Sequence, residues 1–239
     1  MPYIENPKTK GSGILCAIPQ STRCPIGCAD CFFQSGRSYL EPLTKNLPNI
    51  PPDEMIHSHI IRINDGNDSN IDRKEVIKST AWWPNKFYNT SIPNLAFPGP
   101  VVLTVNPADM TDTDAHLLGT APPNLMFVRV RTNTWNIRVV DKVVWHYTAL
   151  NVPIILTFMA YYTEPPKYAD HYTFRKRTTN PYWVITQPCW DGIVRRYELN
   201  DMVYTCGRTA NTHSCARCGN CLREYHATME RMRTGRGRI

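Results

Sequence analysis

Seven of the nine cysteines fall into two clusters, and their spacing is the strongest chemical signal in the chain. The first cluster has the spacing C-x3-C-x2-C and consists of Cys24, Cys28 and Cys31. The second has the spacing C-x8-C-x2-C-x2-C and consists of Cys206, Cys215, Cys218 and Cys221. The N-terminus lacks the apolar stretch of a secretory signal, and clustered cysteines in such a chain indicate metal or redox chemistry rather than disulfides.

The first cluster offers three thiolates and no nearby fourth ligand. A structural zinc site and an electron-transfer cubane cluster each take four protein ligands. Three thiolates in a tight loop therefore predict an iron–sulfur cluster with one iron open to a non-protein ligand. The alternatives are a zinc site completed by the distant Cys16 or Cys206, and a plain electron-transfer cluster.

This spacing, in a loop directly after the first predicted strand of a βα pattern, resembles the radical S-adenosylmethionine (SAM) superfamily. The resemblance implies a catalytic 4Fe–4S cluster on Cys24, Cys28 and Cys31, with SAM chelating the fourth iron. It also implies reduction by a donor such as flavodoxin or ferredoxin, cleavage of SAM to a 5′-deoxyadenosyl radical, and abstraction of a substrate hydrogen. Many members carry an aromatic residue before the third cysteine. Here that residue is Asp30, and Phe32 and Phe33 follow the cysteine, as in divergent, phage-type members.

The resemblance also implies where SAM binds. Family members hold the SAM amino group with a glycine-rich acidic segment after the second strand, and this chain has residues 64–70 at that place, without the usual Gly-Gly-Glu. The candidate residues are Asn64, Asp65, Gly66 and Asp68. The alternative is an Asx-rich turn that caps a helix beginning near Asp72.

Arginines on one face of a predicted strand are candidates for the SAM carboxylate, because a guanidinium can bind a carboxylate through two hydrogen bonds. Arg129, Arg131 and Asn133 alternate with Val128 and Val130 along residues 125–133. Asn133 and Thr134 could hold ribose or carboxylate oxygens, and Thr186 and Gln187 could meet adenine or substrate. The same alternation places Arg62 opposite Ile61 and Ile63, and Thr104 opposite Leu103 and Val105, which predicts a polar cavity face.

The second cluster predicts one metal site. Its C-x2-C-x2-C part matches the run that ligates a cubane cluster, which favours an auxiliary 4Fe–4S cluster, and tetrahedral zinc is the alternative. Cys16 is interpreted as a buried strand residue. Cys189 is interpreted as a core thiol, with a hydrogen-donor or ligand role as the alternative.

The surrounding pattern predicts the elements that position these residues. Apolar runs that predict buried strands cover residues 13–19, 56–64, 100–106, 125–133, 153–161 and 182–187, and helical patterns cover 72–79, 111–118 and 135–150. Strands that alternate with helices indicate a parallel sheet. We therefore expect an α/β fold, a partial (β/α)6 TIM-type barrel over residues 1–200, followed by a small cysteine-rich metal-binding module over 201–239. A doubly wound sheet is the alternative.

Length and charge limit the function classes. The chain has 239 residues, 42% of them hydrophobic, and no apolar stretch long enough to span a bilayer, so we expect a cytoplasmic protein without a membrane partner. The formal charge of +7 favours a polyanionic partner, and the expected substrate is large: a nucleic acid or nucleotide, a peptide or a protein. The alternatives are a glycyl-radical-type activase and a non-catalytic, zinc-stabilised nucleic-acid-binding module. The tail over residues 231–238 is basic.

Overall fold

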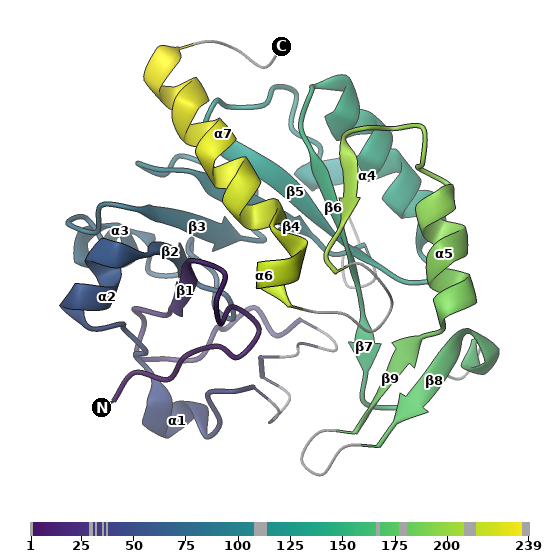
Figure 1. Cartoon of the computed structure of the whole chain (residues 1–239), viewed down its shortest axis with the longest axis horizontal. Coiled ribbons are helices and arrows are strands. Elements are labelled where there is room, and N and C mark those ends of the chain that lie inside the picture. Colours follow the sequence, from purple (N-terminus) through teal and green to yellow (C-terminus); the bar gives the residue numbers. More distant parts are fainter. Residues whose placement is uncertain are drawn as a thin grey trace.

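A seven-stranded parallel sheet, curled into a half-barrel, forms the centre of this computed structural model (Figure 1). The structure describes residues 2–28, 31, 33–34, 36, 38–107, 114–165, 168–176, 181–207 and 214–235. The strands follow one another across the sheet as β1 (Ile14–Ala17), β2 (Ile60–Ile63), β3 (Lys86–Thr90), β4 (Val101–Val105), β5 (Leu125–Thr132), β6 (Ile154–Phe158) and β10 (Val203–Thr205). The strand order along the sheet follows the chain without reversal. A doubly wound sheet reverses its strand order at a switch point, so the doubly wound alternative does not apply. The mixed α/β, partial-barrel prediction is confirmed at this level.

Short helices cover the outer face of the sheet. They are α2 (Asp53–Ser58), α3 (Arg73–Ser79), α4 (Ile137–Ala149) and α5 (Gln187–Arg195), and each contributes apolar side chains to the largest core cluster. In α4 the buried residues are Val140, Val143, Val144 and Tyr147. The helix was expected over residues 135–150 but begins at Ile137, so Trp135 precedes it and is exposed. A further short helix, α1 (Leu43–Asn46), lies in the long β1–β2 connection.

The C-terminal segment packs on the inner face. After β10 the chain forms α6 (Cys215–Cys218) and α7 (Asn220–Thr234), and α7, yellow in Figure 1, crosses the side of the sheet opposite α4 and α5. Tyr225 joins an inner-face core cluster with Phe87, and their ring centroids are 6.2 Å apart. Arg231 donates a hydrogen bond of 3.1 Å from Nη2 to the carbonyl of Leu125, the first residue of β5. Helix α7 therefore covers the amino-terminal part of the inner face. The division of the chain near residue 200 stays a prediction.

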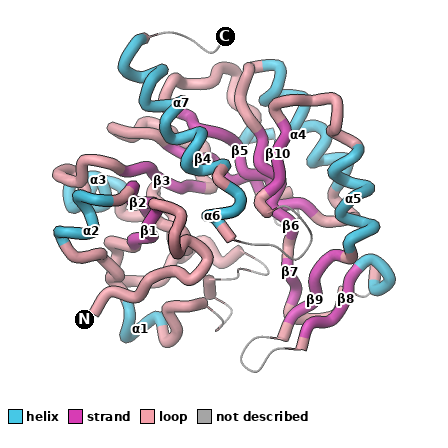
Figure 2. Tube along the Cα trace, viewed as in Figure 1, coloured by secondary structure: helices cyan, strands magenta, loops and turns pink. Residues whose placement is uncertain are grey.

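A small antiparallel sheet corrects one predicted strand. Residues 182–187 were expected in the main sheet, but β9 (Tyr182–Ile185) pairs with β7 (Ala160–Tyr161) and β8 (Tyr172–Arg175) in a separate sheet (Figure 2). The seventh strand of the main sheet is β10, which has only three residues and is too short to be recognised as an apolar run. The strand β3 has the polar sequence KFYNT and was not predicted either. Its burial results from packing on both faces of the sheet and not from an apolar run.

Two other boundaries differ from the sequence pattern. Residues 56–58 end helix α2 instead of beginning a strand, because Pro52 and the acidic residues Asp53 and Glu54 start a helix there. Residues 114–116 form a 3-10 turn, and residues 111–113 of the helix expected over 111–118 lie outside the described residues. No helix in the described part of the chain is long and apolar enough to cross a membrane.

Candidate functional site

The three-cysteine loop begins at the carboxyl end of β1, as expected. All three thiols are partly buried and unbridged in the structure. Burial raises the pKa of the Cys24 thiol, while hydrogen bonds from the backbone amides of Ile26 and Asp68 lower it. The negative charges of Asp68 and Cys31 also raise this pKa. Of the other predicted ligands, Cys31 therefore acts electrostatically on Cys24.

A small core cluster anchors this loop. Cys31 packs against a group formed by Ile18, Phe33, Leu40, Leu43 and Leu47, separate from the main core. The loop is also closed on itself, because Gln34 donates from Nε2 to the carbonyl of Cys24. Apolar burial and a backbone contact thus hold the loop at the edge of the sheet.

The segment after β2 packs directly on the same loop. Asn67 donates from Nδ2 to the carbonyl of Thr22, over 3.0 Å. Gln20 donates from Nε2 to the carbonyl of Asp68, also over 3.0 Å. At Gly66 an added Cβ would lie 2.0 Å from the ring of Phe33, so only glycine allows this approach. The candidate SAM segment and the cysteine loop, about 40 residues apart in the chain, form one structural unit.

The two candidate carboxylates in this segment already have protein partners. Asp65 is buried and accepts hydrogen bonds from Asn6 and Tyr39, and it pairs with Arg62. Asp68 accepts from the Thr90 hydroxyl, from the Ser91 amide and hydroxyl, and from the Asn70 amide. Asp65 thus holds the segment to the N-terminal segment and to the β1–β2 connection, and Asp68 holds it to the end of β3. Their binding of SAM stays a prediction.

Three amide oxygens beside this unit are buried without a partner. They are Oε1 of Gln20, Oδ1 of Asn64 and Oδ1 of Asn67, for which the described residues provide no donor. The amide orientation of Gln20 and Asn67 is fixed, since each NH2 group donates to backbone carbonyls. A buried carbonyl oxygen without a donor costs free energy, about 1–3 kcal/mol, unless a ligand or water supplies one. The sequence did not single out Gln20 or Asn67, because only the tertiary contact leaves their oxygens unpaired.

The predicted residues of β5 have different surroundings from one another. Arg129 donates from Nη1 to Asn89, over 3.3 Å, and lies 3.5 Å from the Thr104 hydroxyl. Arg131, two residues closer to the carboxyl edge, contacts Met159 through Nε. Asn133 is fully buried, accepts from the backbone amides of residues 135 and 136, and donates to Tyr161. Asn133 therefore shapes the turn that begins α4.

The remaining candidates at the ends of strands contact the fold itself. Thr134 contacts His171, and Gln187 donates to Asp191 within α5. Thr186 precedes α5 as its N-cap residue. Cys189, on α5, packs against the outer core, in agreement with its interpretation as a core thiol.

The four C-terminal cysteines lie together on the inner face. Cys206 directly follows β10, and its amide donates to the carbonyl of Leu156. The Cys206 thiol donates to the Cys218 sulfur, which lowers the pKa of Cys218 and raises that of Cys206. Burial raises the pKa of Cys215, and the nearby guanidinium groups of Arg62 and Arg129 lower it. The charge of Cys221 raises the pKa of both Cys206 and Cys215, so all four thiols interact.

Neither cysteine cluster has the close arrangement of sulfur atoms that a metal site requires, among the residues the structure describes. Among the described residues, no three cysteine, histidine or acidic side chains are gathered closely enough to hold a metal ion as they stand. Metal binding at either cluster would therefore draw the sulfur atoms closer together. The side chain of His213, within the second cluster's sequence, lies outside the described residues.

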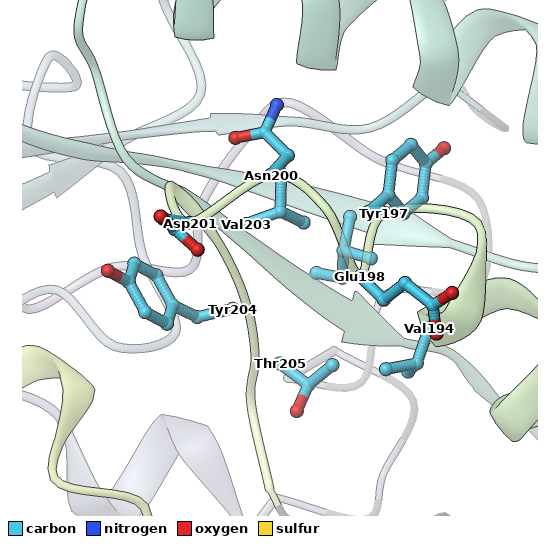
Figure 3. Close-up of a pocket in the computed structure, with 9 residues that line it drawn as sticks. Val194, Tyr197, Glu198, Asn200, Asp201, Val203, Tyr204 and Thr205 are labelled. Carbon is cyan, nitrogen blue, oxygen red and sulfur yellow. The ribbon is translucent and has the colours of Figure 1, made fainter.

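A shallow pocket at the edge of the sheet contains none of the predicted site residues. Its lining comes from α5, the following turn and β10, and includes Tyr197, Glu198, Asp201 and Tyr204 (Figure 3). No charged donor set or unpaired buried oxygen accompanies this pocket in the described structure. The candidate site is therefore the carboxyl edge of β1 and β2.

No protein-family model, curated protein or solved structure matches this chain significantly.

Proposed function

We propose that this chain is a radical SAM enzyme in which Cys24, Cys28 and Cys31 hold a 4Fe–4S cluster at the carboxyl edge of the half-barrel. The observation that supports this best is the packing of the three-cysteine loop on the segment after β2, beside three unpaired amide oxygens. Ligands of parallel α/β sheets bind at the carboxyl ends of the strands, where this unit lies.

The donor chemistry of the loop fits such a cluster. The three thiols are unbridged, and backbone amides donate to the Cys24 sulfur. Hydrogen bonds to cluster sulfurs are among the features that set a reduction potential. When bound, the cluster and SAM supply one-electron chemistry that generates an organic radical.

The unpaired oxygens have a role in this proposal. Gln20, Asn64 and Asn67 accept hydrogen bonds from the methionyl ammonium group, which carries donors and no acceptor. Asp65 and Asp68 act less directly, because their bonds to distant parts of the chain hold the oxygens in place. Gly66 lets Phe33 approach and so keeps the cysteine loop beside them.

Arg131 is the better candidate for the methionyl carboxylate. It lies closer to the carboxyl edge of β5 than Arg129, which bonds to Asn89 and Thr104 in the middle of the inner face. A guanidinium near the edge can bind a carboxylate through two parallel hydrogen bonds.

The position of α7 limits the direction of substrate access. The helix covers the amino-terminal part of the inner face, so substrate approaches from the carboxyl edge, where the proposed cluster lies. The formal charge of +7 favours a nucleic acid or nucleotide as substrate, and a peptide or protein is the alternative.

The test is anaerobic reconstitution with iron and sulfide, followed by measurement of dithionite-driven 5′-deoxyadenosine formation. The C28A variant should lose 5′-deoxyadenosine formation. The matched control C189S removes a thiol that packs against the outer core and should retain the activity. Bound zinc with no iron and no SAM cleavage would overturn the proposal and favour the zinc-stabilised binding module.

A further inference from the structure

Aromatic side chains cross the small antiparallel sheet in a row. Trp183, on the central strand β9, lies directly opposite Phe174 of β8 and Tyr161 of β7 in the strand register. Residues that lie directly opposite in an antiparallel pair share one face of the sheet. Each of the three strands therefore contributes one ring to this face. The ring centroids of Phe174 and Trp183 are 5.4 Å apart.

Trp135 extends these rings towards β5. It lies between the end of that strand and the start of α4, and its ring centroid is 5.2 Å from that of Tyr161. It also stacks on Tyr168, with ring centroids 5.1 Å apart. We call Phe174, Trp183, Tyr161 and Trp135 the aromatic row.

Both ends of the aromatic row are open to solvent, and buried rings support them. Phe174 is 49% exposed and Trp135 is 36% exposed, whereas Tyr161 is buried. Tyr172, also buried, lies 5.7 Å from Trp135 between ring centroids. Trp183 is half-buried and packs against the main core. The exposed rings are therefore flat surfaces fixed by their neighbours, and not isolated surface side chains.

The aromatic row lies at the carboxyl edge of the half-barrel. β7 begins at Ala160, just after β6 ends at Phe158, and Trp135 follows the carboxyl end of β5. Figure 1 shows the small sheet at the lower right, beyond the end of β6. All strands of the main sheet are parallel, so the three-cysteine loop after β1 starts from the same edge. A ligand on the aromatic row thus lies at the edge that carries the proposed cluster.

Two cations follow Phe174 at the end of β8. Arg175 is the last residue of this strand, and the exposed Lys176 comes directly after it. The Nε of Arg175 is buried and has no hydrogen-bond partner among the described residues. A buried donor without an acceptor is costly unless a ligand or water supplies one. The acidic residues between β7 and β8 are Glu164 and Asp170, and neither belongs to a strand of the sheet.

We infer that the aromatic row binds single-stranded nucleic acid, with bases stacked on its exposed rings and phosphates beside Arg175 and Lys176. Every nucleobase has a flat π face that stacks on aromatic side chains, whereas the bases of a duplex already stack on one another. The two cations and the formal charge of +7 favour a polyanion over a peptide. The inference rests on the proposed function in one respect, because it takes this nucleic acid to be the substrate.

The first experiment tests the rings. Fluorescence anisotropy of the reconstituted full-length protein measures its affinity for labelled RNA and DNA single strands of about 12 nucleotides, and for duplexes of the same sequence. F174L should weaken single-strand binding roughly tenfold, because it removes a stacking surface and keeps the apolar bulk. F174Y keeps a ring and should bind like wild type. The matched control W145L removes a ring on α4 that is 57% exposed and should also bind like wild type.

Two outcomes of the first experiment would overturn the inference. Equal single-strand affinities of F174L and W145L would show that the aromatic row does not stack bases. Duplexes bound as tightly as single strands would show recognition of the phosphate backbone alone. Leucine at either position preserves an apolar side chain at an exposed site, and far-UV circular dichroism checks that both variants are folded.

The second experiment tests the cations. R175Q/K176Q should weaken binding and should reduce the slope of log Kd against log salt concentration by about 0.7 for each lost phosphate contact. R138Q changes an exposed arginine on α4 and is the control, with affinity and slope unchanged. An R175Q/K176Q variant with the slope of R138Q would overturn the phosphate contacts.

Measuring 5′-deoxyadenosine formation on the same wild-type preparation separates this inference from the proposed function. A wild-type protein that forms 5′-deoxyadenosine and binds no single strand would overturn the inference, favour a peptide as the substrate, and leave the SAM chemistry in place. A protein that binds single strands through the aromatic row without SAM cleavage would overturn the proposed function and retain the nucleic-acid surface.

Discussion

The guanidinium of Arg62 lies 3.5 Å from the buried carboxylate of Asp65, in the segment that directly follows β2. Asp65 belongs to the segment that packs on the Cys24 loop, where Gly66 contacts Phe33. Cys16, one strand away, faces the same arginine. The pair is therefore expected to hold the segment that supports the Cys24 loop.

Replacing Asp65 by Asn should destabilise the protein strongly. The change removes a charge partner of the largely buried Arg62, and breaking such pairs costs about 3–5 kcal/mol of the free energy of unfolding. Chemical denaturation measures the effect. E230Q, at an exposed pair with Arg233 on α7, is the control and should leave the midpoint unchanged. Equal midpoints for the two variants would show that the Arg62–Asp65 pair contributes nothing.

Replacing Gly66 by Ala should displace the three-cysteine loop. The new methyl group would lie 2.0 Å from the Phe33 ring, an overlap that costs about 1–3 kcal/mol of stability. Iron content and 5′-deoxyadenosine formation should fall together. Adding F33A should restore part of the loss, because it removes the clashing ring.

Gly192→Ala is the matched control for Gly66→Ala. Gly192 lies within α5, and no atom lies within 4 Å of an added Cβ there. This variant should gain about 0.5–1 kcal/mol of stability, because alanine favours the helix. A G66A variant that behaves like G192A would contradict the packing of Phe33 on Gly66.

Replacing Asn67 by Ala should weaken SAM binding by roughly tenfold while iron content stays the same, because a buried acceptor for the ammonium is lost. Calorimetric titration of the reconstituted protein with SAM measures the affinity. N124A is the control, since Asn124 is buried and its side chain donates to the carbonyls of Leu95 and Phe97. If N67A loses iron instead of SAM affinity, Asn67 only supports the loop.

The Asp141 cluster predicts a pH dependence of stability. Burial raises the pKa of Asp141, but hydrogen bonds from Arg196 and Tyr197 outweigh this and lower it below its ordinary value of 3.8. The ionised carboxylate therefore stabilises the fold above pH 3.8, and this contribution is lost as the pH falls through the lowered pKa. D141N should cost about 1 kcal/mol at pH 7, since Arg196 is half exposed.

Unfolding of wild type and D141N at pH 7 and at about pH 2 checks the Asp141 prediction. The Asp141 carboxylate of the wild type is progressively neutralised as the pH falls through its lowered pKa, so the difference in stability should shrink towards the acidic end. A difference that stays constant with pH would mean that the loss comes from packing rather than charge.

The sequence alone determined the chemistry-bearing spacings and most of the sheet. Alternation of Arg129 and Arg131 with Val128 and Val130 is a local property of a strand, so it predicted the inner and outer faces correctly. Apolar runs located β1, β4, β5 and β6 for the same reason. The three-residue β10 and the polar β3 carried no such pattern, because neighbouring strands and layers determine their pairing and burial.

Only the tertiary structure decided which polar groups are satisfied and what faces the cysteines. The sequence favoured the carboxylates of Asp65 and Asp68 as acceptors for the SAM ammonium group, yet Asn6 and Thr90, distant in the chain, already donate to them. The oxygens of Gln20 and Asn67 are unpaired because their NH2 groups are used elsewhere. Arg231 donates to the carbonyl of Leu125, 106 positions earlier, because α7 returns across the sheet. Spacing along the chain fixes which ligands a loop can offer, and long-range packing fixes the charges and donors that surround them.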